Sequence, residues 1–467
     1  MGRKQLEVAR GSDGVAVSAA QYSYNDQGLP ECTAVRMNPS IYASLPASAC
    51  TLGTQGSHGP DRITKNVYDA AGQLLQVRKA VGTPVEIADV TYTYTPNGNQ
   101  KFVIDANGNR AELRYDGHDR LNSWVFPSKT KPTAYNDATP ASALSSSRAP
   151  NEGDYEAYTD DANGNRLTHR KRDGTTLGYQ YDALNRVIRK TVPERSGLPT
   201  IHTRDVFYYY DLRGLQTAVR FGSGSTSPGV ASTYDGFGRL VSETQSTDGT
   251  SRTVSSQYDA NGNRTRVTHP DGHYWQFDYD GLDRATALRY ETTVLGTASF
   301  NARGLLSQRA WTYGTASNNG SSFGYDDAGR LASIALDVDG SSSDVSWAYT
   351  RNPASQIRAE TRSNDAYAWD GHVNVNRAYA TNGLNQCTTA GPAAFCYDAN
   401  GNLTADGSSV YLYDVENRLV ERRVQTNANC AALSYAGALE AALYYDPLGR
   451  LYLVRDWGGR CRIEICD

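Results

Sequence analysis

The sequence has little charge of either sign in excess and no long apolar run. Its 467 residues carry 46 Lys and Arg against 50 Asp and Glu, which gives a net charge of −4. A chain this balanced has no overall attraction to phosphate backbones or anionic lipid, so nucleic-acid binding is not expected as its main task. Nowhere do 18 apolar residues run together, and no apolar signal-peptide core follows Met1. We therefore expect neither a transmembrane helix nor a cleaved leader in this chain.

Aliphatic residues are also scarce. Hydrophobic residues make up 39% of the chain with tyrosine included, and counting glycine instead of tyrosine leaves them under the roughly 45–50% of typical soluble domains. Glycine and tyrosine, at 43 and 32 residues, are abundant. This composition excludes a helical bundle and favours short strands joined by turns. The seven cysteines contain no Cys-x-x-Cys pair, so neither a zinc site nor another cofactor is expected.

The dominant feature is an internal repeat. The dipeptide Tyr-Asp occurs eleven times and is mostly followed by two residues, then Gly, Asn or Asp, then Arg and an aliphatic residue. Between Tyr210 and Tyr325 the copies are 21 to 25 residues apart when the degenerate copy at Phe300 is included. A period repeated this often indicates one small structural unit used many times. The residues expected to form these structural turns are Tyr68, Asp69, Gly72, Tyr115, Asp116, Tyr181, Asp182, Arg186, Tyr210, Asp211, Tyr234, Asp235, Gly238, Arg239, Tyr258, Asp259, Gly262, Tyr279, Asp280, Arg284, Tyr325, Asp326, Gly329, Arg330, Tyr397, Asp398, Gly401, Tyr413, Asp414, Arg418, Tyr445, Asp446, Gly449 and Arg450.

Each unit is predicted to be a β-hairpin. Trp275, Phe277 and Tyr279 alternate with polar residues, which is the period of a strand that ends at the tyrosine. The aspartate then opens a turn by accepting a backbone N–H two residues on. The Gly or Asn that follows supplies a left-handed residue. Asp-Gly pairs such as Asp173-Gly174 predict two-residue turns at the other ends of the strands. The chain is thus expected to be an all-β, antiparallel meander of hairpins.

The repeat resembles the YD repeat of RHS (rearrangement hotspot) proteins, which are related to the shell of animal teneurins. The segments Tyr397-Asp-Ala-Asn-Gly-Asn-Leu403 and Tyr413-Asp-Val-Glu-Asn-Arg-Leu419 are typical of bacterial members. The resemblance implies a curved or spiralling sheet that forms part of a hollow β-shell. In bacterial polymorphic toxins of contact-dependent competition such a shell encloses a C-terminal toxin, and in teneurins it is extracellular and serves adhesion. It therefore implies a secreted or cell-surface protein whose partners are an enclosed toxin segment or the rest of the shell.

The resemblance also fixes expected boundaries. We expect a partial repeat over residues 1–20, the repeat shell over 21–451 with irregular insertions at 37–60 and 132–158, and a non-repeat tail over 452–467. The Asp-Pro core motifs and the toxin domain of longer members are missing. The chain is accordingly expected to be a fragment of such a protein, with a structural and non-catalytic role.

Other chemistry receives little support from the residues. Asp-Ala-Asn-Gly-Asn, which occurs at Asp105, Asp161, Asp259 and Asp398, places oxygens at positions 1, 3 and 5, but glycine stands at position 4 and no Glu closes a calcium loop. No nucleophile elbow, phosphate loop or metal-binding histidine pair is present. No catalytic, cofactor or metal residue is therefore predicted.

Two features leave alternatives open. The tyrosines and arginines could recognise glycans on a cell surface as an adhesin does, or could pair between adjacent strands as structural residues. The structural interpretation is favoured because the tyrosines mark every repeat rather than one patch. Cys387 and Cys396 are symmetric about Gly391-Pro392 and could form a disulfide, as could Cys32 and Cys50; the alternative is free thiols.

Overall fold

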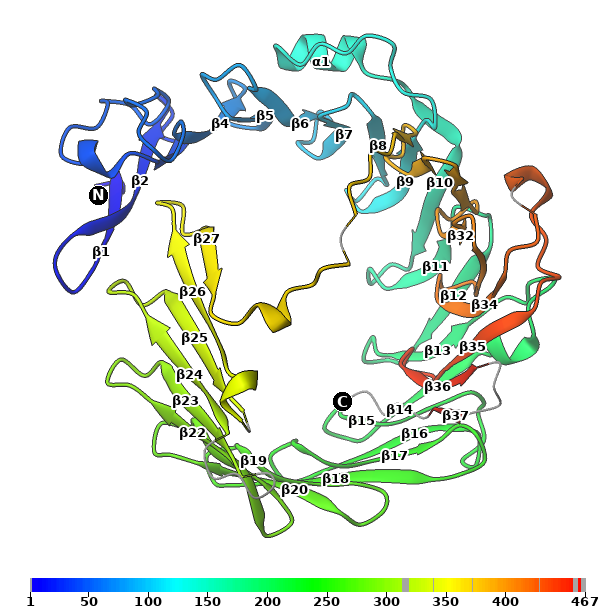
Figure 1. Cartoon of the computed structure of the whole chain (residues 1–467). Helices are drawn as coiled ribbons and strands as arrows, with labels where there is room; N and C mark the ends of the chain where they lie inside the picture. The colour runs from blue at the N-terminus through cyan, green and yellow to red at the C-terminus, as the bar shows by residue number, and fades with distance from the viewer. Residues whose placement is uncertain are drawn as a thin grey trace. The chain divides into compact units, whose positions relative to one another are not determined.

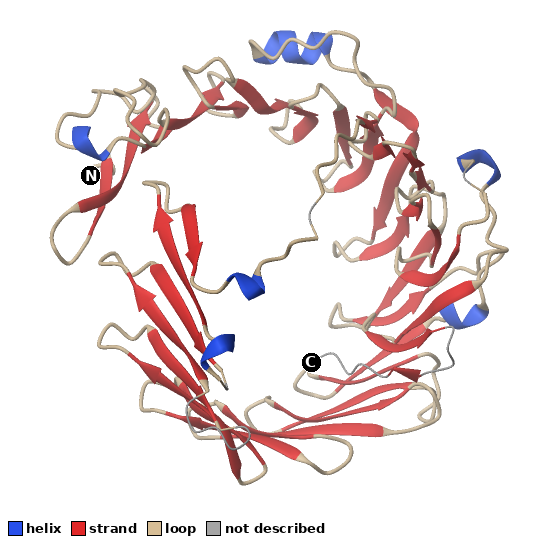
Figure 2. Cartoon of the chain, in the orientation of Figure 1, coloured by secondary structure: helices blue, strands red, loops and turns tan. Residues whose placement is uncertain are grey.

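The fold is built almost entirely from short antiparallel strands (Figures 1 and 2). The computed structural model describes residues 2–312, 319–338, 340–371, 373–427, 429–456 and 461–462. The prediction of an all-β protein made of hairpins is confirmed. The chain divides into two units, one of Met1–Thr93, Asp137–Leu144 and Ser256–Asn374, the other of Tyr94–Asn136, Ser145–Ser255 and Val375–Asp467.

The first unit contains two runs of strands in which each strand pairs with the next along the chain. The first run is β1 (Leu6–Arg10), β2 (Ala16–Tyr24), β3 (Pro30–Arg36), β4 (Arg62–Tyr68), β5 (Leu74–Lys79) and β6 (Ile87–Tyr94). The second run is β19 (Arg264–Thr268), β20 (Tyr274–Tyr279), β21 (Ala285–Tyr290), β22 (Thr293–Phe300), β23 (Leu306–Trp311), β24 (Gly320–Tyr325), β25 (Leu331–Asp337), β26 (Val345–Arg351) and β27 (Ile357–Arg362).

The second unit contains one long run and two further sheets. The long run is β7 (Gln100–Asp105), β8 (Arg110–Tyr115), β9 (Leu121–Pro127), β10 (Pro150–Asp160), β11 (Arg166–Arg170), β12 (Thr176–Tyr181), β13 (Val187–Thr191), β14 (Val206–Tyr210), β15 (Gln216–Arg220), β16 (Gly229–Tyr234), β17 (Leu240–Ser246) and β18 (Arg252–Tyr258). The small sheet is β28 (Tyr379–Thr381), β29 (Cys387–Ala390) and β30 (Ala393–Ala394). The last sheet is β31 (Cys396–Tyr397), β32 (Leu403–Ala405), β33 (Ser409–Tyr413), β34 (Leu419–Val424), β35 (Leu439–Tyr445), β36 (Leu451–Asp456) and β37 (Cys461–Arg462).

Helical structure is confined to connections between strands. The α-helix is α1 (Pro140–Ser146), and the 3-10 helices are η1 (Pro39–Ile41), η2 (Thr200–His202), η3 (Ser341–Ser343), η4 (Asp365–Tyr367) and η5 (Cys430–Ala432). Within the described part of the chain, none of these helices has the length and apolar character needed to span a membrane.

The sequence predicts repeats without interruption from residue 21 to residue 451, but the observed repeats are interrupted after β27. Between β27 and Tyr379 the described residues contain η4 but no strand, and pairing resumes in separate sheets. This stretch lacks the alternation that defines a strand: Trp369, Val373 and Val375 stand exposed among Asn, Asp and Gly. The predicted single meander is therefore a long hairpin sheet followed by two shorter sheets.

Both predicted insertions contain ordered structure. Residues 37–60 are held by the buried ion pair of Arg36 and Asp61 (2.6 Å), whose guanidinium also donates to the carbonyl oxygens of Ser48 and Thr51. The insertion at 132–158 carries α1, but its last nine residues belong to β10. The predicted insertion therefore extends too far at its C-terminal end.

The predicted non-repeat tail at 452–467 begins too early. Residues 452–456 belong to β36, which pairs with β35 as the return strand of an ordinary hairpin. Tyr452 and Leu453 are buried in it. Of the remaining tail, residues 457–460 and 463–467 lie outside the described part of the chain.

The Asp-Gly pairs form loops of two lengths. At Asp173-Gly174 and Asp271-Gly272 the loops have three residues, since the amide of Gly174 donates to Lys171 O (2.9 Å) and that of Gly272 to His269 O (3.0 Å). The predicted two-residue turn is wrong at Asp173-Gly174, because glycine takes the left-handed position that closes a three-residue loop (Gly174 φ 90°). At Asp406-Gly407 the loop does have two residues, closed by Asp406 N–H on Ser409 O (3.3 Å).

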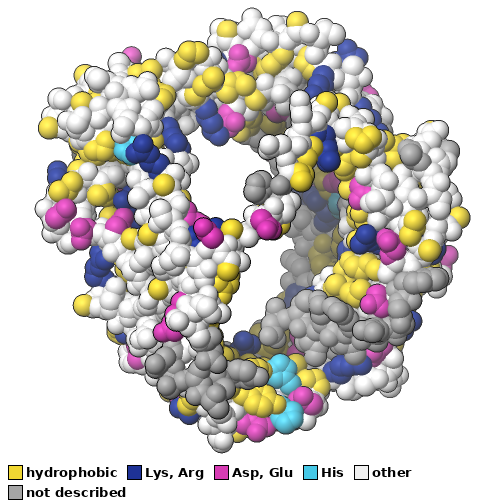
Figure 3. Space-filling model, in the orientation of Figure 1, with side chains coloured by type: hydrophobic (Ala, Val, Ile, Leu, Met, Phe, Trp, Pro, Cys, Tyr) yellow, Lys and Arg dark blue, Asp and Glu magenta, His cyan; other side chains and the backbone are white. Residues whose placement is uncertain are grey.

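Apolar burial is distributed among small clusters. Cys32, Ala34, Ala49 and Ile63 form one, and Cys396, Ala405 and Val410 form another. Figure 3 shows hydrophobic side chains scattered among polar ones on the visible face. Such small clusters fit the low aliphatic content of the sequence.

Candidate functional site: the Tyr-Asp turns

Each Tyr-Asp turn is organised by its aspartate. In the turn at 235–239, Asp235 Oδ1 accepts the amides of Phe237 (2.9 Å) and Arg239 (3.0 Å). The backbone closes the same turn, because Asp235 N–H donates to Arg239 O and Gly238 N–H donates to Asp235 O. Gly238 has a φ of 81°, and Asn185 holds the equivalent position in the turn at 182–186 with a φ of 60°. One carboxylate thus satisfies the backbone donors that a hairpin end would expose to water.

The arginine that closes the motif belongs to the same network. Arg239 Nε donates to Asp235 Oδ2 at 2.7 Å, and the same pairing recurs at Asp116–Arg120, Asp182–Arg186, Asp280–Arg284, Asp326–Arg330, Asp414–Arg418 and Asp446–Arg450. The Arg120 hydrogen bond is the main cause that lowers the pKa of Asp116 to about 2. Similar bonds lower the pKa of Asp182 and Asp280.

These arginines also connect one repeat to the next. The guanidinium of Arg186 lies 4.6 Å from the centre of the Tyr210 ring, that of Arg284 lies 4.3 Å from the Phe300 ring, and that of Arg418 lies 5.0 Å from the Tyr445 ring. In each pair the aromatic residue precedes the following turn. The cation therefore covers a ring face that a ligand would otherwise use.

The tyrosine hydroxyls also connect neighbouring repeats. Tyr234 Oη donates to Gln216 O at 2.9 Å, and Gln216 directly follows the preceding turn at 211–215. The same bond, at 2.8 to 3.0 Å and to the first residue after the preceding turn, is made by Tyr68, Tyr115, Tyr181, Tyr210, Tyr234, Tyr279, Tyr325, Tyr397 and Tyr445. Sequence reasoning missed this bond, although its donor stands at a fixed position in every repeat.

The Asp-Ala-Asn-Gly-Asn segments are variants of the same turn. Asn263 Nδ2 takes the place of the arginine and donates to Asp259 Oδ2 (3.0 Å), and it also reaches Asp283 Oδ1 in the next turn (2.7 Å). Asn165 does the same with Asp161 and Asn185. The amide donors occupy the carboxylates that a cation would need. No group of three or more His, Cys, Asp and Glu side chains suited to a metal is found among the described residues.

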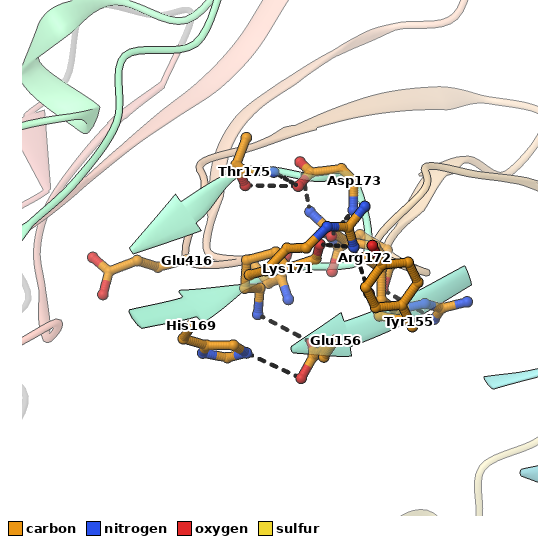
Figure 4. Close-up of polar contacts among 12 residues, drawn as sticks. Tyr155, Glu156, His169, Lys171, Arg172, Asp173, Thr175 and Glu416 are labelled. Atoms are coloured by element: carbon orange, nitrogen blue, oxygen red, sulfur yellow. Dashed lines mark hydrogen bonds and ion pairs between the residues drawn. The ribbon is translucent and has the colours of Figure 1, made fainter. Parts of the chain in front are cut away.

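Late turns of the second unit dock on its earlier strands, a contact that we call the docking seam. It joins the turns at 398–402, 414–418 and 446–450 to the loops at 171–175 and 192–205 and to β17. In its first part Asn400 and Asp173 exchange two hydrogen bonds of 3.0 Å, and Arg172 donates to Asn400 O (3.2 Å). Figure 4 shows Arg172 and Asp173 in this loop. Sequence reasoning did not predict this seam.

The middle of the docking seam combines an apolar contact with an ion pair. Val415 is fully buried against Leu177 and Val192, and Lys190 pairs with Glu416. Asp414, beside Val415, has no exposed surface. The carboxylate that organises an exposed turn elsewhere is thus sealed from water here.

The far part of the docking seam adds an aromatic contact. The rings of His202 and Tyr444 stack with centres 5.6 Å apart, and burial lowers the pKa of His202. Arg450 also binds Glu243 of β17 at 2.8 Å. The seam therefore extends along several strands of the unit.

Beside the docking seam, Figure 4 shows a cluster on β10 and β11. Glu156 lies beside His169 and accepts a hydrogen bond from it at 3.0 Å. It also accepts a hydrogen bond from Tyr158 at 2.8 Å. Burial by itself would raise the pKa of Glu156, but these two bonds and the charge of Lys171 outweigh burial and lower it to about 2. Burial and the bond to Glu156 raise the pKa of Tyr158 to about 12. Near neutral pH Glu156 is therefore a carboxylate and Tyr158 a neutral phenol, so neither of these two groups exchanges a proton there.

Two disulfides join cysteines of the described part of the chain. Cys32 and Cys50 are joined, with an S–S distance of 2.10 Å. The predicted pair of Cys387 and Cys396 is wrong, because Cys396 is bonded to Cys430 and Cys387 is a free thiol. The turn at 391–392 is placed as expected, with Ala390 opposite Ala393. However, β30 ends after two residues, and Cys396 enters the next sheet opposite Ala405.

Comparison with known proteins gives one family match. Residues 161–196 and 258–294 match the family model described as RHS Repeat. No match is found among curated proteins. Among solved structures, the chain resembles TcdB2-TccC3-TEV (13% identity, TM-score 0.48, 96% of this chain and 29% of that chain) and TcdB2-TccC3 (14%, 0.47, 98% and 30%). It also resembles the Photorhabdus luminescens Tc holotoxin pore (13%, 0.45, 97% and 30%). The chain therefore spans less than a third of these matched chains.

Proposed function

We propose that this chain, two segments of which match the RHS Repeat family model, is a non-catalytic wall segment that encloses a polypeptide guest, such as the toxin segment of a longer protein. The observation that carries this proposal is the use of the repeat side chains. The tyrosine hydroxyls bind backbone carbonyls of the preceding repeat, and the arginines bind the turn aspartates and cover aromatic rings of the next repeat. Side chains committed to their neighbours build a wall and are poorly placed to hold a ligand.

The docking seam gives further support. A wall must close on itself if it is to retain a guest, and a row of turns seated on the loops of earlier strands is a way to do so without a large apolar core. The buried Val415 and the ion pair of Lys190 and Glu416 give this contact both burial and direction. The glycan-binding alternative gains no comparable support, since the tyrosines that it would use are engaged within the wall.

The disulfides are evidence for the cellular compartment in which this protein works. Two bridges, Cys32–Cys50 and Cys396–Cys430, fit an oxidising compartment better than the cytosol. The proposal therefore places the protein outside the cytosol, secreted or on the cell surface.

A protection assay tests the proposal. An unstructured, protease-sensitive reporter is fused after Asp467 of the full chain, and its cleavage is compared with that of the same reporter fused before Met1. We expect the C-terminal reporter to be cleaved at least about tenfold more slowly, since access then requires an opening of the wall. Opening the docking seam with Asp414→Ala and Asp446→Ala should remove the difference. Equal cleavage at both ends of the unmodified chain would refute the enclosing role.

A further inference from the structure

Two different kinds of surface meet in the docking seam. In the second unit, Tyr-Asp turns of late strands sit on the opposite loops of earlier strands, as Asn400 does on Asp173. The first unit repeats this arrangement on a small scale. The loop between β1 and β2 meets the Tyr-Asp turn at 326–330, where Ser12 Oγ donates to Asp327 Oδ1 at 2.6 Å, and a Cβ on Gly11 would lie 2.8 Å from Asp327 Cβ. A Tyr-Asp turn edge and a loop edge are thus complementary surfaces in this fold.

One turn edge of the second unit exposes large apolar residues. The consecutive turns at 182–186, 211–215 and 235–239 carry Leu184, Leu212 and Phe237 at their tips, with exposures of 71%, 108% and 89%. Val415, at the tip of a turn in the docking seam, has an exposure of 0%. The three exposed residues thus occupy positions in their turns like that of Val415, but no other segment of the described chain buries them.

The three tips form one continuous row. Arg186 donates to Asp211 O (3.4 Å) and Arg213 donates to Asp235 O (2.8 Å), so each turn is bonded to the next. Since two strands separate successive turns, the tips are about 10 Å apart. Three large apolar side chains at that spacing make a contiguous patch rather than isolated surface residues.

The chain itself carries the complementary loop edge. Among the described residues, the opposite loops of the β31–β37 sheet are those that join β32 to β33 and β34 to β35. These strands also carry the turns of the docking seam. Beside these loops Val424 and Tyr435 are partly exposed, at 41% and 39%, and the loop of β32 and β33 is exposed at Ser408. This edge offers apolar side chains beside polar loop backbone, as Leu177 and Val192 do beneath Val415.

We propose that the turn edge of Leu184, Leu212 and Phe237 binds a second copy of this chain through the loop edge of its β31–β37 sheet. The contact repeats the docking seam between two molecules. Because the two edges are different surfaces, the association is head-to-tail. The proposal does not depend on the enclosed guest, so either can fail while the other holds.

Sedimentation velocity of the full chain tests this association. We expect reversible, concentration-dependent association that becomes at least about tenfold weaker when Leu184, Leu212 and Phe237 are all changed to Asp. Val85→Asp is the matched control, because Val85 is equally exposed (73%) but lies away from any Tyr-Asp turn; it should associate as the unmodified chain does. A monomer at all concentrations, or equal association of the triple variant, would overturn the proposal.

A crosslinking experiment tests the identity of the two edges. Leu212→Cys in one preparation and Ser408→Cys in another, both with Cys387→Ser, are mixed under mild oxidation. We expect a disulfide between positions 212 and 408 that peptide mapping identifies as intermolecular, and no comparable product when Val85→Cys replaces Leu212→Cys. Crosslinks that form equally at both positions would show that the association is not specific to the turn edge.

Discussion

Replacing a turn aspartate that is buried in the docking seam should destabilise the fold far more than replacing an equivalent aspartate in an exposed turn. Asp414 Oδ1 accepts the amides of Glu416 and Arg418 at 2.9 Å, and Oδ2 accepts Arg418 Nε at 2.6 Å. Its exposure is 0%. Replacement by alanine leaves two backbone donors and a guanidinium without an acceptor where water has little access.

The cost follows from the bonds lost. An orphaned buried donor costs about 1–3 kcal/mol, and Arg418, which is 20% exposed, recovers part of its hydration. Taking the low end for each donor, Asp414→Ala should destabilise β33–β36 by about 3 kcal/mol. That energy corresponds to more than a hundredfold faster opening, since about 1.4 kcal/mol is a factor of ten.

Hydrogen exchange by mass spectrometry measures this opening locally, which suits a repeat protein that need not unfold in one step. The matched control is Asp235→Ala, which breaks the same three kinds of bond in a turn that water reaches. We expect a clearly smaller acceleration in β16 and β17 than in β33–β36. Equal acceleration at both turns, or less than about threefold in β33–β36, would refute the reasoning.

Three further predictions concern the turns and the cysteines. Tyr445→Phe removes the donor to Leu419 O and should destabilise β35 and β36 by about 1 kcal/mol, whereas Tyr379→Phe, on an exposed ring, should have no effect in the same denaturation assay. Because the turn aspartates have lowered pKa values, about 2 for Asp116 against an ordinary 3.8, their stabilisation is complete above pH 3.8 and should be lost as the pH falls toward 2; circular dichroism that shows full stability at pH 2 would contradict this. Alkylation before reduction should label Cys387 and leave Cys396 and Cys430 unlabelled, and label on Cys430 would contradict the assigned bridge.

The local structure of the repeat could be predicted from sequence because it depends on neighbouring residues. A strand that ends at Tyr279, a turn opened by Asp280 and a left-handed residue three positions later are all encoded within seven residues. The Asp-Gly loops show the limit of this reasoning. Whether glycine occupies the second or the third loop position depends on the register of both strands, so Asp173-Gly174 closes a longer loop than expected.

Contacts between distant segments could not be predicted in this way. The bond from Tyr234 to Gln216 O requires the stacking of successive hairpins, and the docking seam requires the chain to leave the first sheet after β27. The pairing of Cys396 with Cys430 has the same origin. Symmetry about Gly391 places Cys387 opposite Cys396, but the strand breaks at Phe395, and nothing local to either cysteine signals that break.

The central claim is that the Tyr, Asp and Arg side chains of each repeat bind groups of their own and neighbouring repeats. Amide hydrogen exchange of the turns across the whole chain tests this claim most directly. The amides of Phe237 and Arg239, which donate to Asp235, and their counterparts in the other Tyr-Asp turns should exchange much more slowly than those of the exposed loop residues 223–226, with protection that recurs once per repeat. Turn amides that exchange as fast as those of that loop would contradict the claim.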